Sequence, residues 1–203
     1  MEAKFGTILP TFAPMLTFDL THFPVLTTER LVLRALRVSD VEEVFALRAD
    51  PAVMQHVNRP LATSLQDAEA LIAKVNDGVA ANTSIHWAIT RKGDDRFIGL
   101  IGFWRIVKEH DLGELGYMLA RAHWGQGLTS EAIAAVLPVG FGTLGMHRVE
   151  AITRPVNRAS IRALEKNGFV QEATLRDAVF FNGAFHDSMV FGRLAEGAAP
   201  RPA

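Results

Sequence analysis

The stretch Leu115-Gly-Tyr-Met-Leu-Ala-Arg-Ala-His-Trp-Gly-Gln-Gly-Leu-Thr-Ser-Glu131 changes character along its length. Its first part is typical of a strand, a short loop follows, and a helix is expected after Gly127. The closely spaced Gly125 and Gly127 would let the backbone approach an anion closely. A helix start adds unpaired N–H groups and the positive end of the helix dipole. The stretch therefore predicts a turn that binds a phosphate or diphosphate.

This turn has three other interpretations. A Walker loop would need a Gly-Lys-Ser/Thr sequence, and no lysine is present here. A dinucleotide fingerprint would need a third glycine at Ser130, with an acidic residue about 20 positions later, where Glu150 lies. An ordinary helix-capping turn is the third alternative, and the spacing alone favours anion binding over it.

Outward from this turn, hydrophobic periodicity and capping residues predict a series of short elements. Ser39 with Glu42 has the spacing of a capping box, and Thr63 with Gln66 repeats it. Helices are expected at 39–48, 63–80, 127–141 and 157–167, and strands at 30–36, 85–90, 97–107, 114–119, 148–153, 169–175 and 185–194. Pro138 is expected to kink or end the third helix.

These elements predict an α/β (α+β) fold. The turn at 91–95 joins two strands as a hairpin, so the sheet cannot be purely parallel. The strand–helix–strand unit after Glu114 needs a crossover and hence parallel pairing. We expect a mixed, largely antiparallel sheet with helices on both faces. One domain is expected at 25–194, preceded by an extension at 1–24 and followed by a disordered tail at 195–203.

Composition narrows the classes of function. The 203 residues carry a net charge of -1, which gives no general reason to bind nucleic acid, and no apolar run is long enough to predict a membrane span. The absence of cysteine excludes disulfides, thiolate metal sites and a cysteinyl acyl-enzyme, and suits a cytoplasmic protein. Pro10 and Pro14 argue against a signal peptide. The histidine spacing predicts no metal site.

Four segments resemble one protein family. Trp124-Gly-Gln-Gly-Leu-Thr129 resembles the GNAT signature Q/R-x-x-G-x-G/A, with tryptophan first, as in its RimJ/RimL-type branch. Thr129 stands where the signature has Gly or Ala. The segments 28–34, 157–169 and 181–187 resemble the family's opening strand, its second coenzyme-A-contacting helix and its final hairpin. Together they span about Thr28 to Leu194 in the family's order.

The resemblance implies an enzyme that moves an acetyl group from acetyl-CoA to a primary amine, without a metal. The acceptor would be a protein N-terminal amine or a small amine, and a homodimer is compatible with it. The implied cofactor-binding residues are Met118, Leu119, Trp124, Gly125, Gln126, Gly127, Leu128, Thr129, Ser130 and Asn157. Of these, Met118 and Leu119 would hold the pantetheine arm. Asn157 is also well suited to cap a helix, and the two roles are compatible.

The resemblance also implies candidate catalytic residues. Ser160 matches the serine near the CoA sulfur in RimL-like enzymes, although it could be an ordinary first-turn serine. Val179 stands at the position that matches the family's glutamate base. Glu114 is the best substitute, with a surface carboxylate as its alternative, and His186 and Asp187 come next. Histidine exchanges a proton readily near neutral pH, but His186 could equally be a solvated strand residue.

Two other classes of function stay open at this point. A non-catalytic acyl-CoA-binding sensor or interaction module would keep the turn without a base, and Val179 gives that alternative weight. A phosphate-loop nucleotide hydrolase is disfavoured because the turn has no lysine.

Overall fold

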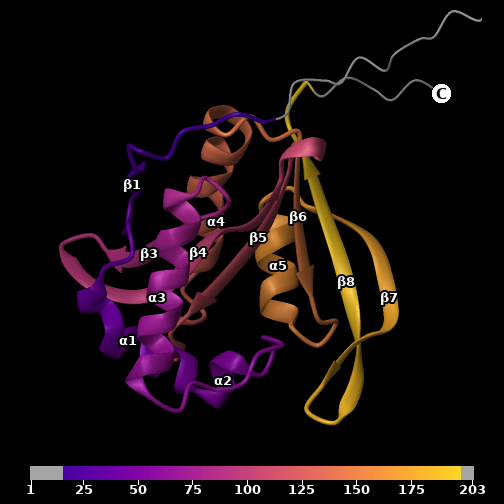
Figure 1. Cartoon of the computed structure of the whole chain (residues 1–203). Coiled ribbons are helices and arrows are strands. Elements are labelled where there is room, and N and C mark those ends of the chain that lie inside the picture. The colour runs from indigo at the N-terminus through magenta and orange to yellow at the C-terminus, as the bar shows by residue number, and fades with distance from the viewer. Residues whose placement is uncertain (1–15, 198–203) are drawn as a thin grey trace, which may run out of the picture.

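Within residues 16–197, which the computed structural model describes, one eight-stranded sheet runs in the order β1-β2-β3-β4-β5-β6-β8-β7 (Figure 1). The strands are β1 (Leu26–Thr27), β2 (Leu31–Arg34), β3 (Ile85–Arg91), β4 (Asp94–Val107), β5 (Leu112–Leu119), β6 (Arg148–Thr153), β7 (Val170–Phe181) and β8 (Ala184–Leu194). The helices are α1 (Val41–Ala49), α2 (Pro51–Met54), α3 (Leu65–Ala80), α4 (Leu128–Pro138) and α5 (Arg158–Lys166). Our expectations for 1–15 and 198–203 lie outside the described residues.

The pairing confirms the predicted mixed, largely antiparallel sheet. All neighbouring strands are antiparallel except β5 and β6, which pair in parallel over Leu112–Glu114 and Arg148–Glu150. The crossover between them is α4, as a strand–helix–strand unit requires. The predicted hairpin is β3–β4, and its turn is tighter than expected, because the strands extend to Arg91 and Asp94.

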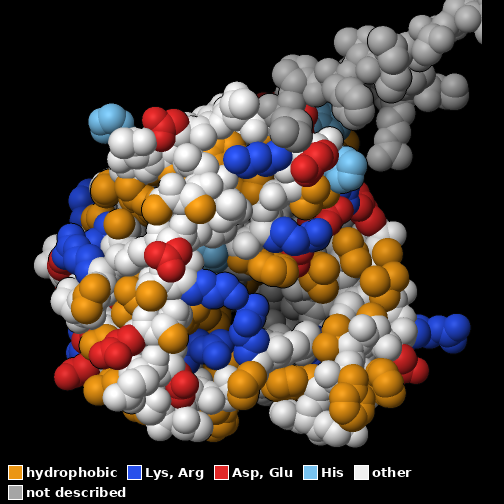
Figure 2. Space-filling model, in the orientation of Figure 1, with side chains coloured by type: hydrophobic (Ala, Val, Ile, Leu, Met, Phe, Trp, Pro, Cys, Tyr) orange, Lys and Arg blue, Asp and Glu red, His pale blue; other side chains and the backbone are white. Residues whose placement is uncertain are grey.

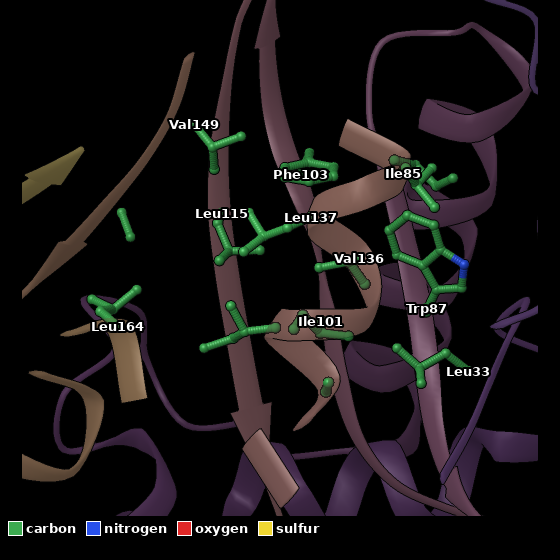
Figure 3. Close-up of a cluster of buried hydrophobic side chains, with 14 of the residues drawn as sticks. Leu33, Ile85, Trp87, Ile101, Phe103, Leu115, Val136, Leu137, Val149 and Leu164 are labelled. Atoms are coloured by element: carbon green, nitrogen blue, oxygen red, sulfur yellow. The ribbon is translucent and has the colours of Figure 1, made fainter. Parts of the chain in front are cut away.

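Helices cover both faces of the sheet and create two hydrophobic cores (Figure 1). The larger core lies under α4 and α5, where Val136 and Leu137 pack over Ile101 and Leu115 (Figure 3). The smaller core lies under α1 and α3 and includes the α3 residues Ala68, Ile72 and Val75. Alternate side chains of a strand point to opposite faces, so each central strand contributes to both cores.

The first predicted capping box is wrong. The N-cap of α1 is Asp40 rather than Ser39, and a 3-10 turn over Val38–Asp40 precedes the helix. Buried Arg34 donates to both Asp40 carboxylate oxygens at 2.7 and 2.8 Å, and Arg37 N–H donates to Asp40 Oδ2 at 2.8 Å. A buried guanidinium needs a carboxylate partner, and this tertiary requirement decides where the helix begins.

The second box is displaced by one residue. Ser64 is the N-cap of α3, and Asp67 Oδ2 accepts the N–H groups of Thr63 at 2.7 Å and Ser64 at 3.1 Å. Asp50 ends α1 as expected but also begins the short helix α2, because its side chain accepts Ala52 N–H at 2.8 Å.

The C-terminal half follows the prediction more closely. Regular α-helix ends at Pro138 and a π-helical turn follows over Val139–Thr143. Gly168 has a φ of +76°, which suits a left-handed residue after α5. β7 is six residues longer than expected at its end, because 176–181 continue the hairpin with β8. No helix within 16–197 has the length and apolar character needed to cross a membrane.

We expect Ile101→Ala to lower the free energy of unfolding by about 2–5 kcal/mol, because its side chain is fully buried in β4 and truncation leaves a cavity. Ile152→Ala is the matched control, since this β6 isoleucine is 49% exposed and should cost less than about 1 kcal/mol. Urea unfolding of both variants measures the difference. Equal losses would contradict the position of the core.

Candidate functional site

The sheet opens between β5 and β6. Their parallel pairing stops at Glu114 and Glu150, yet β5 continues to Leu119 and β6 to Thr153 (Figure 1). The two facing edges therefore carry backbone N–H and C=O groups that no neighbouring strand satisfies. Such groups need partners, and an extended ligand with amide groups could supply them. This gap is the centre of the candidate site.

The glycine turn lies at the open end of the gap, between β5 and α4. Gly125 and Gly127 both have left-handed backbones, with φ values of +72° and +75°, and Gly127 is the N-cap of α4. A Cβ at Gly125 would meet no atom within 4 Å, so its space is open to a ligand. The first N–H groups of α4 are free of intrahelical partners, which suits an anion at this position.

A partly buried charge network holds this turn against the start of the sheet. Glu131 in α4 accepts from Thr28 Oγ1 at 2.5 Å, Arg30 N at 2.9 Å and Arg30 Nε at 2.7 Å. Arg30 also donates to the carbonyl oxygen of Gln126 at 2.9 Å. Burial opposes ionisation of Glu131, but the donors from Thr28 and Arg30 outweigh it and lower its pKa. The Arg30 guanidinium thus joins the loop to the first turns of α4.

A surface cavity of about 510 Å³ lies beside the turn. Arg30, Gln126 and Gly127 line one part of it, and Lys166 and Asn167 at the end of α5 line another. Glu29 and Glu131 also line the cavity, so its charges balance, and it is the neighbouring helix N-terminus that favours a ligand that carries phosphate.

The structure gives some predicted cofactor-binding side chains other partners. Trp124 Nε1 donates to the Leu119 carbonyl at 2.7 Å, so the indole ties the loop to the end of β5. Gln126 Nε2 donates to Ala122 O at 3.2 Å. Leu128 belongs to the main core, and Met118 packs against the smaller core. Leu128 is therefore buried, whereas the side chains of Trp124 and Gln126 stay exposed beside these contacts.

The remaining predicted contacts lie on α4 and α5. Ser130 is buried, and its Oγ accepts from Asn167 Nδ2 at 2.9 Å, while Thr129 is partly buried beside it. Asn157 Oδ1 accepts Ser160 N–H at 3.2 Å, so Asn157 is the N-cap of α5, one of the two roles expected for it. The first contact joins the start of α4 to the end of α5, and the second fixes the start of α5.

Ser160 lies in a pair that the sequence analysis missed. Its Oγ is 2.7 Å from the hydroxyl of Tyr117, which projects from β5 and packs against the larger core. Burial raises the pKa of Tyr117 to about 12, against the opposing effect of the Ser160 hydrogen bond. Tyr117 therefore keeps its proton at neutral pH and can donate it or share it with Ser160.

Glu114 lies at the closed end of the gap, where parallel pairing stops. It is 6% exposed, and Arg105 contacts its Oε2 through Nη2 at 2.9 Å and Nε at 3.0 Å. Oε1 is outside this ion pair. Arg105 and the half-exposed Trp104 line a cavity with Lys74 of α3, so Glu114 faces the α3 side of the sheet. Tyr117, three residues on, faces the opposite side.

His186 and Val179 lie directly opposite each other in the β7–β8 hairpin. His186 Nε2 is 3.1 Å from Phe181 O, and its Nδ1 is 2.7 Å from an Arg154 nitrogen. A carbonyl and a guanidinium together require a neutral ring with its proton on Nε2. Both ring nitrogens are thus engaged. Asp187 accepts Asp177 N–H at 3.0 Å, as expected of a carboxylate that caps a backbone amide.

No group of three or more His, Asp or Glu side chains within 16–197 is arranged to hold a metal ion. The chemistry available at the gap is that of hydroxyls, carboxylates and backbone amides.

The fold and the gap define a class of protein that binds a phosphate-bearing ligand between diverging strands, and comparisons with known proteins identify the family. The acetyltransferase (GNAT) domain family matches residues 30–170. The uncharacterized N-acetyltransferase YoaA of Bacillus subtilis is 34% identical over 169 residues, which cover 83% of this chain and 96% of that protein. The chain therefore belongs to the GNAT acetyltransferase family.

Two further comparisons include proteins of the RimJ/RimL type. The ribosomal-protein-serine acetyltransferase of Escherichia coli is 32% identical over 103 residues, or 51% of this chain and 58% of that protein. A solved structure of RimL, a ribosomal L7/L12 α-N-protein acetyltransferase in complex with coenzyme A, has a TM-score of 0.78 at 21% identity. It covers 85% of this chain and 99% of the RimL chain.

Sequence reasoning missed three residues of the site. Tyr117 is the only tyrosine of the chain and stands inside the diagnostic stretch, a signal that could have drawn attention to it. In the sequence, Arg30 stood out only as a member of the segment 28–34, which resembles the family's opening strand. Arg154 had no signal, because its partners lie about 100 and 32 residues away in the sequence.

We expect Gly127→Val to weaken acetyl-CoA binding at least about 10-fold, since a β-branched residue is strained at a φ of +75° and would distort the turn. Gly93→Val is the matched control: Gly93 has a φ of +86° in the β3–β4 turn, with open space around it. Isothermal calorimetry measures both affinities. An unchanged affinity in Gly127→Val would refute the assignment of the turn.

Proposed function

We propose that the protein transfers an acetyl group from acetyl-CoA to a primary amine by direct attack in a ternary complex. The observation that carries this proposal is the gap between β5 and β6, with the glycine turn at its open end and the Tyr117–Ser160 pair at its side. Membership of the GNAT family supports the reaction type. A thioester bound in the gap could be reached from both faces of the sheet.

The cofactor fits the groups that line the gap. The N–H groups from Gly125 to Ser130 would hold the diphosphate, with Arg30 and Lys166 at the edge of the neighbouring cavity. The unpaired edges of β5 and β6 would bind the amides of the pantetheine arm, which lie next to the thioester. Asn157 would act by fixing the start of α5, since its side-chain oxygen already caps that helix.

The reaction needs two proton transfers besides the bond exchange. The neutral amine attacks the thioester carbonyl carbon, a C–N bond forms, and the C–S bond breaks. The ammonium proton leaves to a base, and the thiolate takes a proton from a donor. Tyr117 and Ser160 support the donor role because they share one hydrogen bond and Tyr117 stays protonated at neutral pH.

Glu114 is the base that the geometry supports best, directly or through a water molecule. It lies at the closed end of the gap on the α3 face, opposite the side of Tyr117, and its Oε1 is outside the Arg105 ion pair. His186 has both ring nitrogens engaged and would first have to lose its contact with Arg154. Proton acceptance on one face and donation on the other is consistent with substrates that approach from opposite sides.

The sensor alternative is not favoured, because the Tyr117–Ser160 pair and Glu114 retain chemistry at the gap although Val179 replaces the expected glutamate. The acceptor class proposed is a protein N-terminal amine or a small amine. A cytoplasmic location and a homodimer remain parts of the proposal, the first supported by a chain without cysteine.

Turnover is tested by release of the CoA thiol, detected with a thiol reagent, from acetyl-CoA and a panel of N-terminal peptides and small amines. Ser160→Ala and Tyr117→Phe should each lower kcat by on the order of 10- to 100-fold, with a smaller change in KM for acetyl-CoA, since each loses part of the proton donor. The double variant should be little slower than either single variant. Additive losses would contradict a shared donor, and no release with any amine would favour the sensor.

Glu114→Gln should lower kcat by about 100-fold at neutral pH and partly recover as the pH rises, because a larger fraction of the amine is then neutral without a base. His186→Gln is the comparison, since a glutamine can still accept from Arg154. pH–rate profiles of the two variants separate the candidates. A profile for Glu114→Gln that superimposes on the wild type would remove Glu114 from catalysis.

A further inference from the structure

Arg154 contacts two segments on the α3 side of the sheet, the residue after α2 and the β7–β8 hairpin. We call the space between these segments the groove. Arg154 directly follows β6, and its guanidinium donates to Gln55 O, just after α2, at 2.9 Å. It also contacts His186 Nδ1 of the β7–β8 hairpin at 2.7 Å. Figure 2 shows a hollow near the centre of this face, with Lys and Arg side chains along one edge.

The charge of Arg154 has no carboxylate partner within 16–197. Its contacts are with a carbonyl and a neutral imidazole, because Phe181 O places the His186 proton on Nε2. None of the ion pairs of the described chain includes it. A guanidinium has five N–H donors in a fork that suits a carboxylate, and these two contacts leave others for a ligand.

A second residue indicates an excess of positive charge at this place. His56 lies just after α2, and its pKa is lowered by burial and by the charge of Arg154. Its Nδ1 is buried without a hydrogen-bond partner among the described residues. Arg154 therefore provides the positive charge at this end of the groove, with the rings of His56 and His186 beside it. An anion would relieve both the unpaired guanidinium and the unpaired ring nitrogen.

The position matches the path of an acceptor. Arg154 is two residues beyond Ile152, which is 49% exposed on the β6 side of the gap, so both project from the same face. Their Cα atoms are about 7 Å apart along an extended chain. Two extended peptide residues span about the same length. An acceptor whose reacting amine lies beside Ile152 could thus reach Arg154 with a carboxylate one or two residues away.

We propose that Arg154 binds a carboxylate of the amine acceptor, so that the protein prefers primary amines that carry a negative charge within about two residues of the reacting nitrogen. The inference rests on the proposed acetyl transfer and names its substrate class. Neutral and polycationic amines are disfavoured, because they leave Arg154 unpaired or repel it.

The test compares kcat/KM for matched peptide amides, Ala-Asp-Ala and Ala-Asn-Ala, and for the dipeptide Ala-Ala with and without its free carboxylate. We expect the wild type to prefer the anionic member of at least one pair by about 10-fold or more. A preference in the first pair places the carboxylate on a side chain, and one confined to the second pair places it at a C-terminus. Arg154→Gln should reduce the ratio to about one, and Arg154→Lys should retain part of it.

Two controls keep the result specific. Both kcat/KM values in a ratio are measured on the same protein preparation. A smaller folded fraction in Arg154→Gln therefore lowers both values equally and leaves the ratio unchanged. Arg59→Gln removes the same charge from an exposed position on the α2–α3 connection and should leave the ratio unchanged. A wild-type ratio near one with measurable acetylation would overturn this inference while the proposed function stands. So would an equal loss of preference in Arg59→Gln. Acetyl-CoA that is never consumed would overturn the proposed function itself.

Discussion

The functional geometry depends on the separation of two parallel strands. β5 and β6 pair for three residues, and after Glu114 and Glu150 the sheet can no longer satisfy their facing backbone groups. Parallel pairing is possible only because α4 crosses over, and the same crossover places the helix N-terminus at the open end of the gap. One topological feature therefore creates both the polar edges and the anion site.

The conformation of the glycine turn depends on the contacts that hold it. Left-handed glycines allow many conformations, and the ion pair between Arg30 and Glu131 selects one by joining α4, the Gln126 carbonyl and the start of β2. Trp124 adds a second attachment at Leu119 O. Preorganised amides cost less conformational entropy on binding than a mobile loop would.

The site divides chemistry between the two faces of β5. Glu114 faces the side of α3 and the cationic end of the groove at Arg154, whereas Tyr117 meets Ser160 on the side of α5. The alternation of side chains along one strand is sufficient to separate them. The separation is consistent with an amine and a thiolate that need opposite proton transfers at the same carbon. The inferred carboxylate contact of Arg154 belongs to the amine side.

The sequence by itself determined the class of fold, the crossover and the position of the glycine turn, because periodicity, turn residues and helix caps are local properties. It also pointed to Asn157 and Ser160 through family resemblance. Only the tertiary structure decided that Asp40 rather than Ser39 precedes α1, that Tyr117 pairs with Ser160, and that Arg154 contacts both the Gln55 carbonyl and the His186 ring. These contacts join residues far apart in the chain, and long-range packing and charge pairing leave no periodic signal in a single sequence.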